Sequence, residues 1–370
     1  MSIYFDNAAT TPLAPEVKEE LLRIFDRPPG NSSSIHSHGV NSSLIVEAAR
    51  ANVARILGCH PDEIFFTSGG TESNNWVFTG IAEDPSVPKH VVVSSIEHAS
   101  ILGPVNHLEK KGWKVTRLPV SSEGIVSPST LDTVLSQTPA ALVSVMTANN
   151  EIGSLQDISA LSCVCRKHQT LFHTDATQAV GKIPLNLSEQ MVDFLTFSAH
   201  KIHGPLGVGA LFIRKGRDLP PLLLGGPQEA NHRAGTVNNA AIAGLSVALT
   251  ISSPTPSELT ERLIEEILKT ISRAQLNGPR MNRLPGNVHF SFPGFEGRKL
   301  LRELDRRGFI VSTGSACSAG MNIPSHVLLA LGKSHEEALS SLRISLSRYN
   351  SRDEVDAFLA AFKDIIVKHP

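Results

Sequence analysis

Short apolar runs alternate with segments of helical periodicity from about Val46 to Val247, and this alternation constrains the fold most. The stretch IVEAARANVARILG repeats its apolar residues at the spacing of an amphipathic helix. The strand-like runs, each bounded by polar turns, are EIFFTSG, KHVVVSSIEH, AALVSVMTAN, TLFHTDATQAVG, DFLTFSAHK and GVGALFIRK. This pattern predicts an α/β fold in which helices cover both faces of a mainly parallel sheet. Ligands of such sheets bind beyond the carboxyl ends of the strands, so polar residues at those ends are the candidate site.

The pattern changes near Ser252. Residues 252–257 indicate a connector, and an amphipathic helix is expected from Glu258 onward. Later come NVHFSFPG, a helix over about Arg298–Arg307, GFIVSTGSACSAG and a helical C-terminal segment. We therefore expect residues 15–252 to form a large domain. Residues 1–14 and 253–370 are expected to form a smaller α+β domain, with the first residues folding back onto it.

Composition excludes several classes of protein. The chain has 370 residues, 41% of them hydrophobic and 19% charged, with a formal net charge of -1. This balance gives no electrostatic case for nucleic acid or a membrane surface as a partner. No apolar stretch approaches the roughly 20 residues of a membrane span, and MSIYFDNAATTPLAPEV shows no secretory signal. Because Cys163 and Cys165 are too close in sequence for an ordinary disulfide, we expect a reduced, cytoplasmic protein.

A lone lysine, Lys201, follows one strand-like run within SAHKIHGPLG. An ammonium at the edge of a core is desolvated, which lowers its pKa and makes the neutral amine available as a nucleophile. At another strand end, TSGGTESNN leads into a helix. Its backbone N–H groups would suit an anion, although Thr71 or Ser73 could simply cap the helix.

Three further strand ends carry polar side chains. Asp175 follows the apolar LFH, where it could pair with a protonated heterocyclic nitrogen or cap a helix. His98 in SIEHASI could stack on a planar ligand, shuttle protons or be a hydrogen-bonded core residue. The stretch TANNEIG adds amide donors, which a plain turn would also explain.

Four cysteines are present, and one stands apart. Cys317 lies among small residues in GSACSAG, which give it nothing to pack against, whereas an isolated cysteine is usually a small buried hydrophobe. Cys59, Cys163 and Cys165 lie on helix-like stretches and are expected in the core. We expect no metal site, because the C-x-C pair has no second pair at a suitable spacing.

An anion cradle, a buried aspartate, a histidine and a lysine are what an enzyme needs to hold a phosphorylated pyridine aldehyde. The motifs TSGGTESNN, EHAS, NNEIG, HTDATQAVGKIP and SAHKIHGPLGVGAL follow the order and spacing of class V, fold-type I pyridoxal-phosphate enzymes. With DNAATTPLAPEV and STGSACSAG added, the chain resembles the cysteine desulfurases of the NifS and IscS kind, from about Tyr4 to Tyr349. The resemblance implies a seven-stranded, mainly parallel sheet in a large cofactor-binding domain, and a small domain that carries the cysteine loop.

The resemblance also implies how pyridoxal 5'-phosphate is bound. Lys201 matches the Schiff-base lysine and Asp175 the partner of the pyridine nitrogen. Gln178 matches the donor to the phenolic oxygen, and His98 the ring that stacks on the pyridine and exchanges protons. Positions that bind the phosphate are matched by Gly70, Thr71, Ser198 and His200. Thr236 matches a threonine that the partner subunit contributes, which implies a homodimer with a shared site.

For the substrate, the resemblance implies L-cysteine held by Asn150 and by a bidentate contact from Arg343. Without the resemblance, Arg343 would pass as a surface charge. Lys201 would remove the α-proton, and the Cys317 thiolate would take the sulfur as a persulfide and release alanine. An acceptor protein of iron–sulfur cluster assembly or of tRNA or cofactor thiolation would then receive the sulfur. The alternatives are a class V aminotransferase, a selenocysteine lyase, or a catalytically silent scaffold protein.

Overall fold

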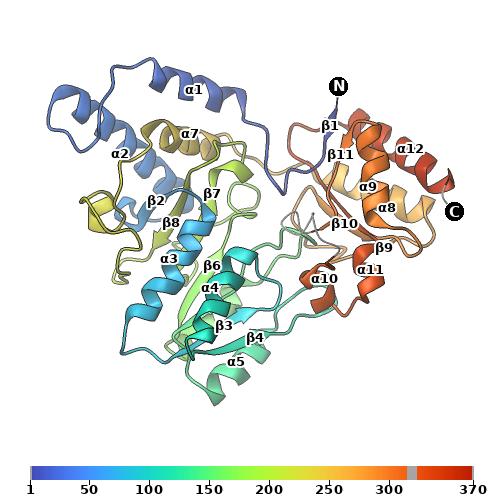
Figure 1. Ribbon diagram of the computed structural model, residues 1–370, viewed down its shortest axis with the longest axis horizontal. Helices are drawn as coiled ribbons and strands as arrows, with labels where there is room; N and C mark the ends of the chain where they lie inside the picture. Colours follow the sequence, from blue (N-terminus) through green and yellow to red (C-terminus); the bar gives the residue numbers. More distant parts are fainter. Residues whose placement is uncertain (1, 315–322, 369–370) are drawn as a thin grey trace.

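The computed structural model describes residues 2–314 and 323–368. Figure 1 shows two lobes, one built around a large sheet and the other around α8, α9, α12 and the short strands near both chain ends. Cys317 and its neighbours in GSACSAG from residue 315 onward lie outside the described residues.

A seven-stranded sheet forms the centre of the larger lobe, in the order β2-β8-β7-β6-β5-β3-β4. Only β8 runs antiparallel to its neighbours, β2 and β7, so the prediction of a mainly parallel sheet is confirmed. The strands are β2 (Ile64–Thr67), β3 (His90–Ser94), β4 (Lys114–Leu118), β5 (Leu142–Ser144), β6 (Leu171–Asp175), β7 (Phe194–Ser198) and β8 (Gly209–Ile213).

Helices cover both faces of this sheet, which is why its strands are continuously apolar. Alternate residues of β3 show the two sides: Val92 belongs to one core cluster, whereas Val91 and Val93 belong to another. The second face is covered by α3 (Gly70–Glu83) and α4 (Ala99–Lys110). Elements packed on the first are α2 (Ser37–Leu57), α5 (Pro128–Gln137), α6 (Ile158–Lys167) and α7 (Asn239–Thr250), with α1 (Pro15–Phe25) against α7. Short 3-10 turns are η1 (Pro61–Glu63), η2 (Ala199–Lys201) and η3 (Glu229–Asn231).

The smaller lobe combines both ends of the chain. β1 (Ile3–Tyr4) pairs in parallel with β11 (Phe309–Ile310), so the first residues do fold back onto these elements. A second sheet has the antiparallel order β12 (Ser341–Ser345), β10 (Asn287–Ser291), β9 (Gln275–Leu276). The helices are α8 (Ser257–Thr270), α9 (Gly297–Arg306), α10 (His326–Ala330), α11 (His335–Leu339) and α12 (Arg352–Lys368). Except for α10 and α11, these elements share a separate apolar core. Helices α10 and α11 pack against Ile96, Met146 and Ile152 of the larger lobe, and the division of the chain at residue 253 stays a prediction.

The expectation of a core position for three cysteines is wrong for Cys163, which is exposed. Cys165 is buried and Cys59 is half-buried. Residues two apart on a helix project about 200° apart, so α6 can bury only one of its two cysteines. Among the helices in the described part of the chain, none is long and apolar enough to cross a membrane.

Candidate active site

The carboxyl ends of the central strands surround a cavity of about 240 Å³. Several predicted residues line it from separate strand ends, namely Gly70, Thr71, His98, Asp175 and Lys201. Asn150, Gln178, Ser198 and His200 line it as well. The sheet topology therefore brings together residues that are up to 131 positions apart, from Gly70 to Lys201.

An anion cradle lies where β2 turns into α3. Gly69 has a φ of 153°, a conformation that a side chain would strain. A Cβ atom on Gly209 would lie 2.7 Å from the Gly69 Cα, so the two backbones approach each other as only glycines allow. The first N–H groups of α3 have no partner within the helix, and the helix dipole favours an anion beside them. Nearby, the buried Thr177 Oγ1 has no hydrogen-bond partner among the described residues, although it lines the cavity.

Asp175 is the last residue of β6 and is buried at the floor of the cavity. Its Oδ1 accepts a hydrogen bond from the Thr177 N–H at 2.9 Å, and its Oδ2 accepts one from Asn74 Nδ2 at 2.8 Å. Each carboxylate oxygen has a second lone pair, so Asp175 retains the capacity to accept a further N–H group. A protonated ring nitrogen is a group of that kind, and it would balance the buried charge.

His98 lies at the start of α4, and its hydrogen bonds define its tautomer. The Ser100 N–H donates to His98 Nδ1 at 3.1 Å, so Nδ1 is an acceptor and the proton lies on Nε2. Ser100 Oγ, 2.8 Å from Nδ1, also accepts from Asn74 Nδ2, which links His98 to Asp175 through two side chains. Burial lowers the pKa of His98 below its ordinary value despite the nearby Asp175 carboxylate, so the ring is neutral near pH 7.

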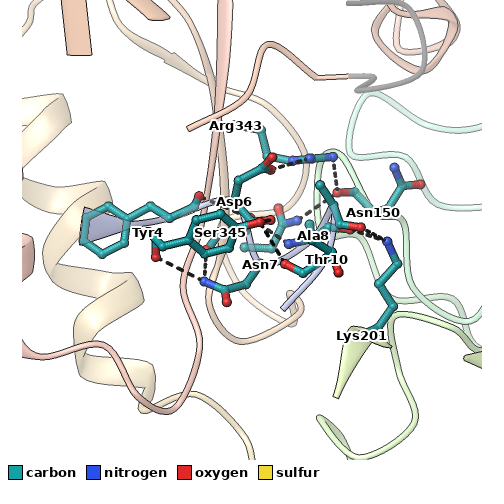
Figure 2. A network of polar contacts seen from close by, with 12 residues as sticks. Tyr4, Asp6, Asn7, Ala8, Thr10, Asn150, Lys201, Arg343 and Ser345 are labelled. Atoms are coloured by element: carbon teal, nitrogen blue, oxygen red, sulfur yellow. Dashed lines mark hydrogen bonds and ion pairs between the residues drawn. The ribbon is translucent and has the colours of Figure 1, made fainter. Parts of the chain in front are cut away.

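Lys201 ends the 3-10 turn that follows β7, and it reaches the N-terminal segment of the chain (Figure 2). Its Nζ donates to the carbonyl oxygens of Ala8 at 2.9 Å and Ala9 at 2.5 Å. His200 Nδ1 lies 3.1 Å from Thr10 Oγ1 in the same segment. Burial, together with the charges of Lys201 and Lys182, lowers the pKa of His200 to about 4, so this ring is also neutral.

Arg343 approaches the cavity from the other lobe and is buried rather than on the surface, because its strand β12 is covered on both sides. Its Nη2 donates to Asp6 Oδ1 at 2.8 Å, and its Nη1 donates to the Asn150 carbonyl at 3.3 Å (Figure 2). The Arg343 Nε is buried without a partner in the described part of the molecule. This guanidinium therefore has N–H groups left for an incoming carboxylate.

Two predicted site residues in the described part of the chain, Thr236 and Arg343, are not among those that line this cavity. Thr236 is exposed and does not line the cavity of its own chain. The same would hold for a residue that completes the site of another subunit. Cys317 lies outside the described residues. The last described residue before it, Gly314, is beside Glu151, because a Cβ there would lie 3.1 Å from Glu151 Oε2.

Sequence reasoning missed five side chains in or beside the site: Asp6, Asn74, Ser100, Thr177 and Lys182. Asn74 follows Thr71 by one helical turn in TESNN, and this spacing could have placed both on the cavity side of α3. Asp6 sits in DNAATT, but nothing local indicates that it pairs with Arg343, 337 positions later. Lys182 follows Gln178 by one turn, and its Nζ donates to Gln178 Oε1 at 2.9 Å.

Comparison with known proteins is consistent across sequence and structure. A family profile described as "Aminotransferase class-V" matches residues 3–358. The chain is 45% identical to "Cysteine desulfurase IscS" of Dictyoglomus turgidum over 99% of this chain and 95% of that protein. A solved structure titled "NIFS-LIKE PROTEIN" superposes with a TM-score of 0.92 and 36% identity, over 100% of both chains. Another, "SspA in complex with cysteine", has a TM-score of 0.85 and 34% identity over 95% of this chain and 100% of that one.

Proposed function

We propose roles for the residues of this chain from its membership of the class-V aminotransferase family. Within that family it belongs to the pyridoxal-phosphate-dependent cysteine desulfurases of the NifS and IscS kind. The substrate is L-cysteine, and the products are L-alanine and a persulfide on Cys317. The observation that carries this assignment is the convergence of Lys201, Asp175 and His98 on one cavity beside the N-terminus of α3.

The residues present fit pyridoxal phosphate. The glycine turn before α3, the unpartnered Thr177 Oγ1 and the neutral His200 suit a phosphate group. The phosphate contacts are assigned to Gly70, Thr71, Ser198 and His200, with Thr236 from a second subunit. Asp175 accepts from the ring nitrogen, His98 stacks on the ring, and Gln178 donates to the phenolic oxygen. When bound through Lys201, the cofactor supplies an electron-withdrawing ring for an amino acid attached at its aldehyde carbon.

The chain's own groups then handle substrate and protons. Arg343 and Asn150 hold the cysteine carboxylate, and the Lys201 amine removes the α-proton. The Cys317 thiolate attacks the substrate sulfur: an S–S bond forms, the C–S bond breaks, and its electron pair stays on the carbon. Protonation of that carbon gives alanine. His98, neutral with its proton on Nε2, is placed to donate or accept a proton during these steps.

Replacing Cys317 with alanine tests the assignment. We expect no protein persulfide and alanine formation reduced by at least about 100-fold, because the nucleophile that takes the sulfur is missing. Persulfide is measured by alkylation and mass spectrometry, and alanine by amino-acid analysis. Cys163→Ala is the matched control, since it removes an exposed thiol elsewhere and should leave both products at wild-type levels. Equal alanine rates in the Cys317→Ala and wild-type proteins would refute the role of Cys317, and keto-acid formation would indicate an aminotransferase.

The proposed homodimer is supported by exposed apolar residues on α1, α2 and the loop before η3, elements that lie on the same side of the larger lobe (Figure 1). Phe25 is 69% exposed, Leu44 62% and Leu224 85%, and exposed apolar residues that gather in this way mark an interface.

We expect Leu224→Glu to weaken the dimer at least about tenfold, because a charge would be buried without a partner. Size-exclusion chromatography with light scattering across a dilution series measures the change. Met281→Glu is the control, because Met281 is 73% exposed and lies away from this face. A monomeric wild-type protein, or an unchanged dimer in the Leu224 variant, would refute this interface.

The persulfide sulfur is proposed to pass to an acceptor protein in the cytoplasm, for iron–sulfur cluster assembly or for tRNA or cofactor thiolation. Capture of partners by the persulfidated wild-type protein under non-reducing conditions, compared with Cys317→Ala, identifies the acceptor. Proteins captured only by the wild type support sulfur transfer. A protein that stays colourless with added pyridoxal phosphate would instead indicate a catalytically silent scaffold.

A further inference from the structure

Lys182 is a largely buried cation that the mechanism above does not use. Two buried arginines have carboxylate partners: Arg50 pairs with Glu229, and Arg343 with Asp6. Arg283 instead donates to three backbone carbonyls. In residues 2–314 and 323–368, no ion pair includes Lys182. Removing an ammonium from water without an opposite charge costs several kcal/mol, so its position calls for a reason beyond stability.

The hydrogen bonds of Lys182 point to that reason. Its Nζ donates to Gln178 Oε1 at 2.9 Å, and Gln178 Nε2 donates to the Ala8 carbonyl at 2.9 Å. The same carbonyl accepts from Lys201 Nζ at 2.9 Å. An ammonium has three donors and no acceptor, so it can bond only the oxygen of an amide. Lys182 thereby dictates that the NH2 end of Gln178 faces the N-terminal segment and Lys201.

We propose that Lys182 is a positioning residue that fixes the orientation of the Gln178 amide, so that an N–H group is presented to the phenolic oxygen of bound pyridoxal phosphate. This inference rests on the proposed function, since it concerns how that site holds its cofactor. Without the ammonium, only the Ala8 carbonyl still favours this orientation. A 180° rotation, which would present the amide oxygen to an anionic phenolic oxygen, then costs less.

The surroundings of Lys182 make its effect on the Gln178 amide sensitive to pH. Burial, with the charges of Lys201 and Arg343, lowers the pKa of Lys182 to about 7. Asp6 offsets the charge of Arg343, and the neighbouring rings of His200 and His203 have pKa values lowered by burial and by Lys182 among other cations. The ammonium form opposes the rotated amide more strongly than the neutral amine, because a neutral amine can also accept a hydrogen bond.

The test is the pH midpoint of the visible absorption change of the protein loaded with pyridoxal phosphate, measured without substrate. We expect Lys182→Met to raise this midpoint by about one pH unit. The variant loses a nearby cation and, through Gln178, a donor to the phenolic oxygen. Both losses favour the protonated form of the link between Lys201 and the cofactor. The cofactor dissociation constant, measured by fluorescence, is expected to rise about tenfold.

A double-mutant cycle separates positioning from charge alone. In a Gln178→Leu background, Lys182→Met should shift the midpoint by less than half as much, because only the loss of the cation still acts and the amide is gone. Lys333→Met is the matched control: Lys333 Nζ donates to Gln275 Oε1 at 2.6 Å, so the variant breaks a similar Lys–Gln bond in the other lobe. Its midpoint should equal that of the wild type. Lys182→Gln, uncharged and shorter, replaces the methionine variant if that protein does not fold, with the same expected shift.

Each outcome has one meaning. An unchanged midpoint in both Lys182 variants would overturn the inference, and so would a shift that keeps half or more of its size in the Gln178→Leu background. A wild-type protein that shows no visible band with pyridoxal phosphate would instead overturn the proposed function. A shift that falls to less than half in that background supports the positioning role.

Discussion

Replacing Lys201 with alanine is expected to lower the rate of alanine formation from L-cysteine by about 10²- to 10⁴-fold, the usual contribution of a positioned acid–base group. The variant loses both the amine that binds the cofactor and the base that removes the α-proton. Its visible absorption with pyridoxal phosphate should resemble that of the free aldehyde. Stopped assays of alanine, with saturating cofactor and cysteine, measure the rate, and the absorption spectrum reports the lost bond independently.

The Lys201 variant also loses hydrogen bonds to the Ala8 and Ala9 carbonyls, so folding must be monitored. Urea unfolding should show a loss of no more than about 3–6 kcal/mol, in keeping with two charge-assisted hydrogen bonds. Lys333→Ala, which removes a lysine from the other lobe, should retain the wild-type rate. A Lys201→Ala protein that formed alanine at more than about a tenth of the wild-type rate would show that another group is the base.

Replacing Glu229 with alanine is expected to destabilise the fold by about 3–5 kcal/mol, because it leaves the buried Arg50 without its charge partner. Glu229 accepts from Arg50 Nη1 at 2.9 Å and Nη2 at 2.8 Å, and its Oε2 also accepts from the Phe66 N–H at 2.8 Å. These bonds tie η3 and α2 to β2, beneath the strand end that leads to the anion cradle. The change is measured as the difference in free energy of unfolding from urea titrations at pH 7.

The chain offers an internal control, since Glu47 pairs with the same Arg50 from the surface at 3.2 Å. Its side chain is 58% exposed, compared with 2% for Glu229, and an exposed pair contributes at most about 1 kcal/mol. Glu47→Ala should therefore shift the unfolding free energy by less than 1 kcal/mol. Similar losses for both variants would mean that burial does not decide the strength of these pairs.

Much of the fold can be predicted from the sequence, because the hydrophobic pattern of each segment matches its burial in the folded chain. Strands buried on two faces, such as β3 with Val91, Val92 and Val93, must be continuously apolar, and this signature survives without any structure. The strand order cannot be predicted in this way, since the chain contains no local sign that β8 lies between β2 and β7. Cys163 shows a further limit: helical periodicity was recognised over the segment, but not which face of the helix packs inward.

The candidate site was predictable to the extent that its residues follow strands. Asp175 and Lys201 stand at carboxyl ends, and parallel strands bring such ends to one edge. Partners that act through another side chain left no local signal. Asn74 and Ser100 join Asp175 to His98 only after three elements have packed together. For this reason the sequence indicates the groups that line the cavity better than those that orient them.

The N-terminal segment imposes an order on biosynthesis. Residues 3–4 pair with residues 309–310, and Asn7 donates through its side chain to the Ser345 carbonyl at 2.8 Å. The segment whose Ala8 and Ala9 carbonyls accept hydrogen bonds from Lys201 is thus held by residues 309–345, which leave the ribosome late. A growing chain can form the central sheet long before it can close the site, because pairings this distant form late. A stalled or truncated product that ends before β12 would lack the Arg343–Asp6 pair, which joins the N-terminal segment to the smaller lobe.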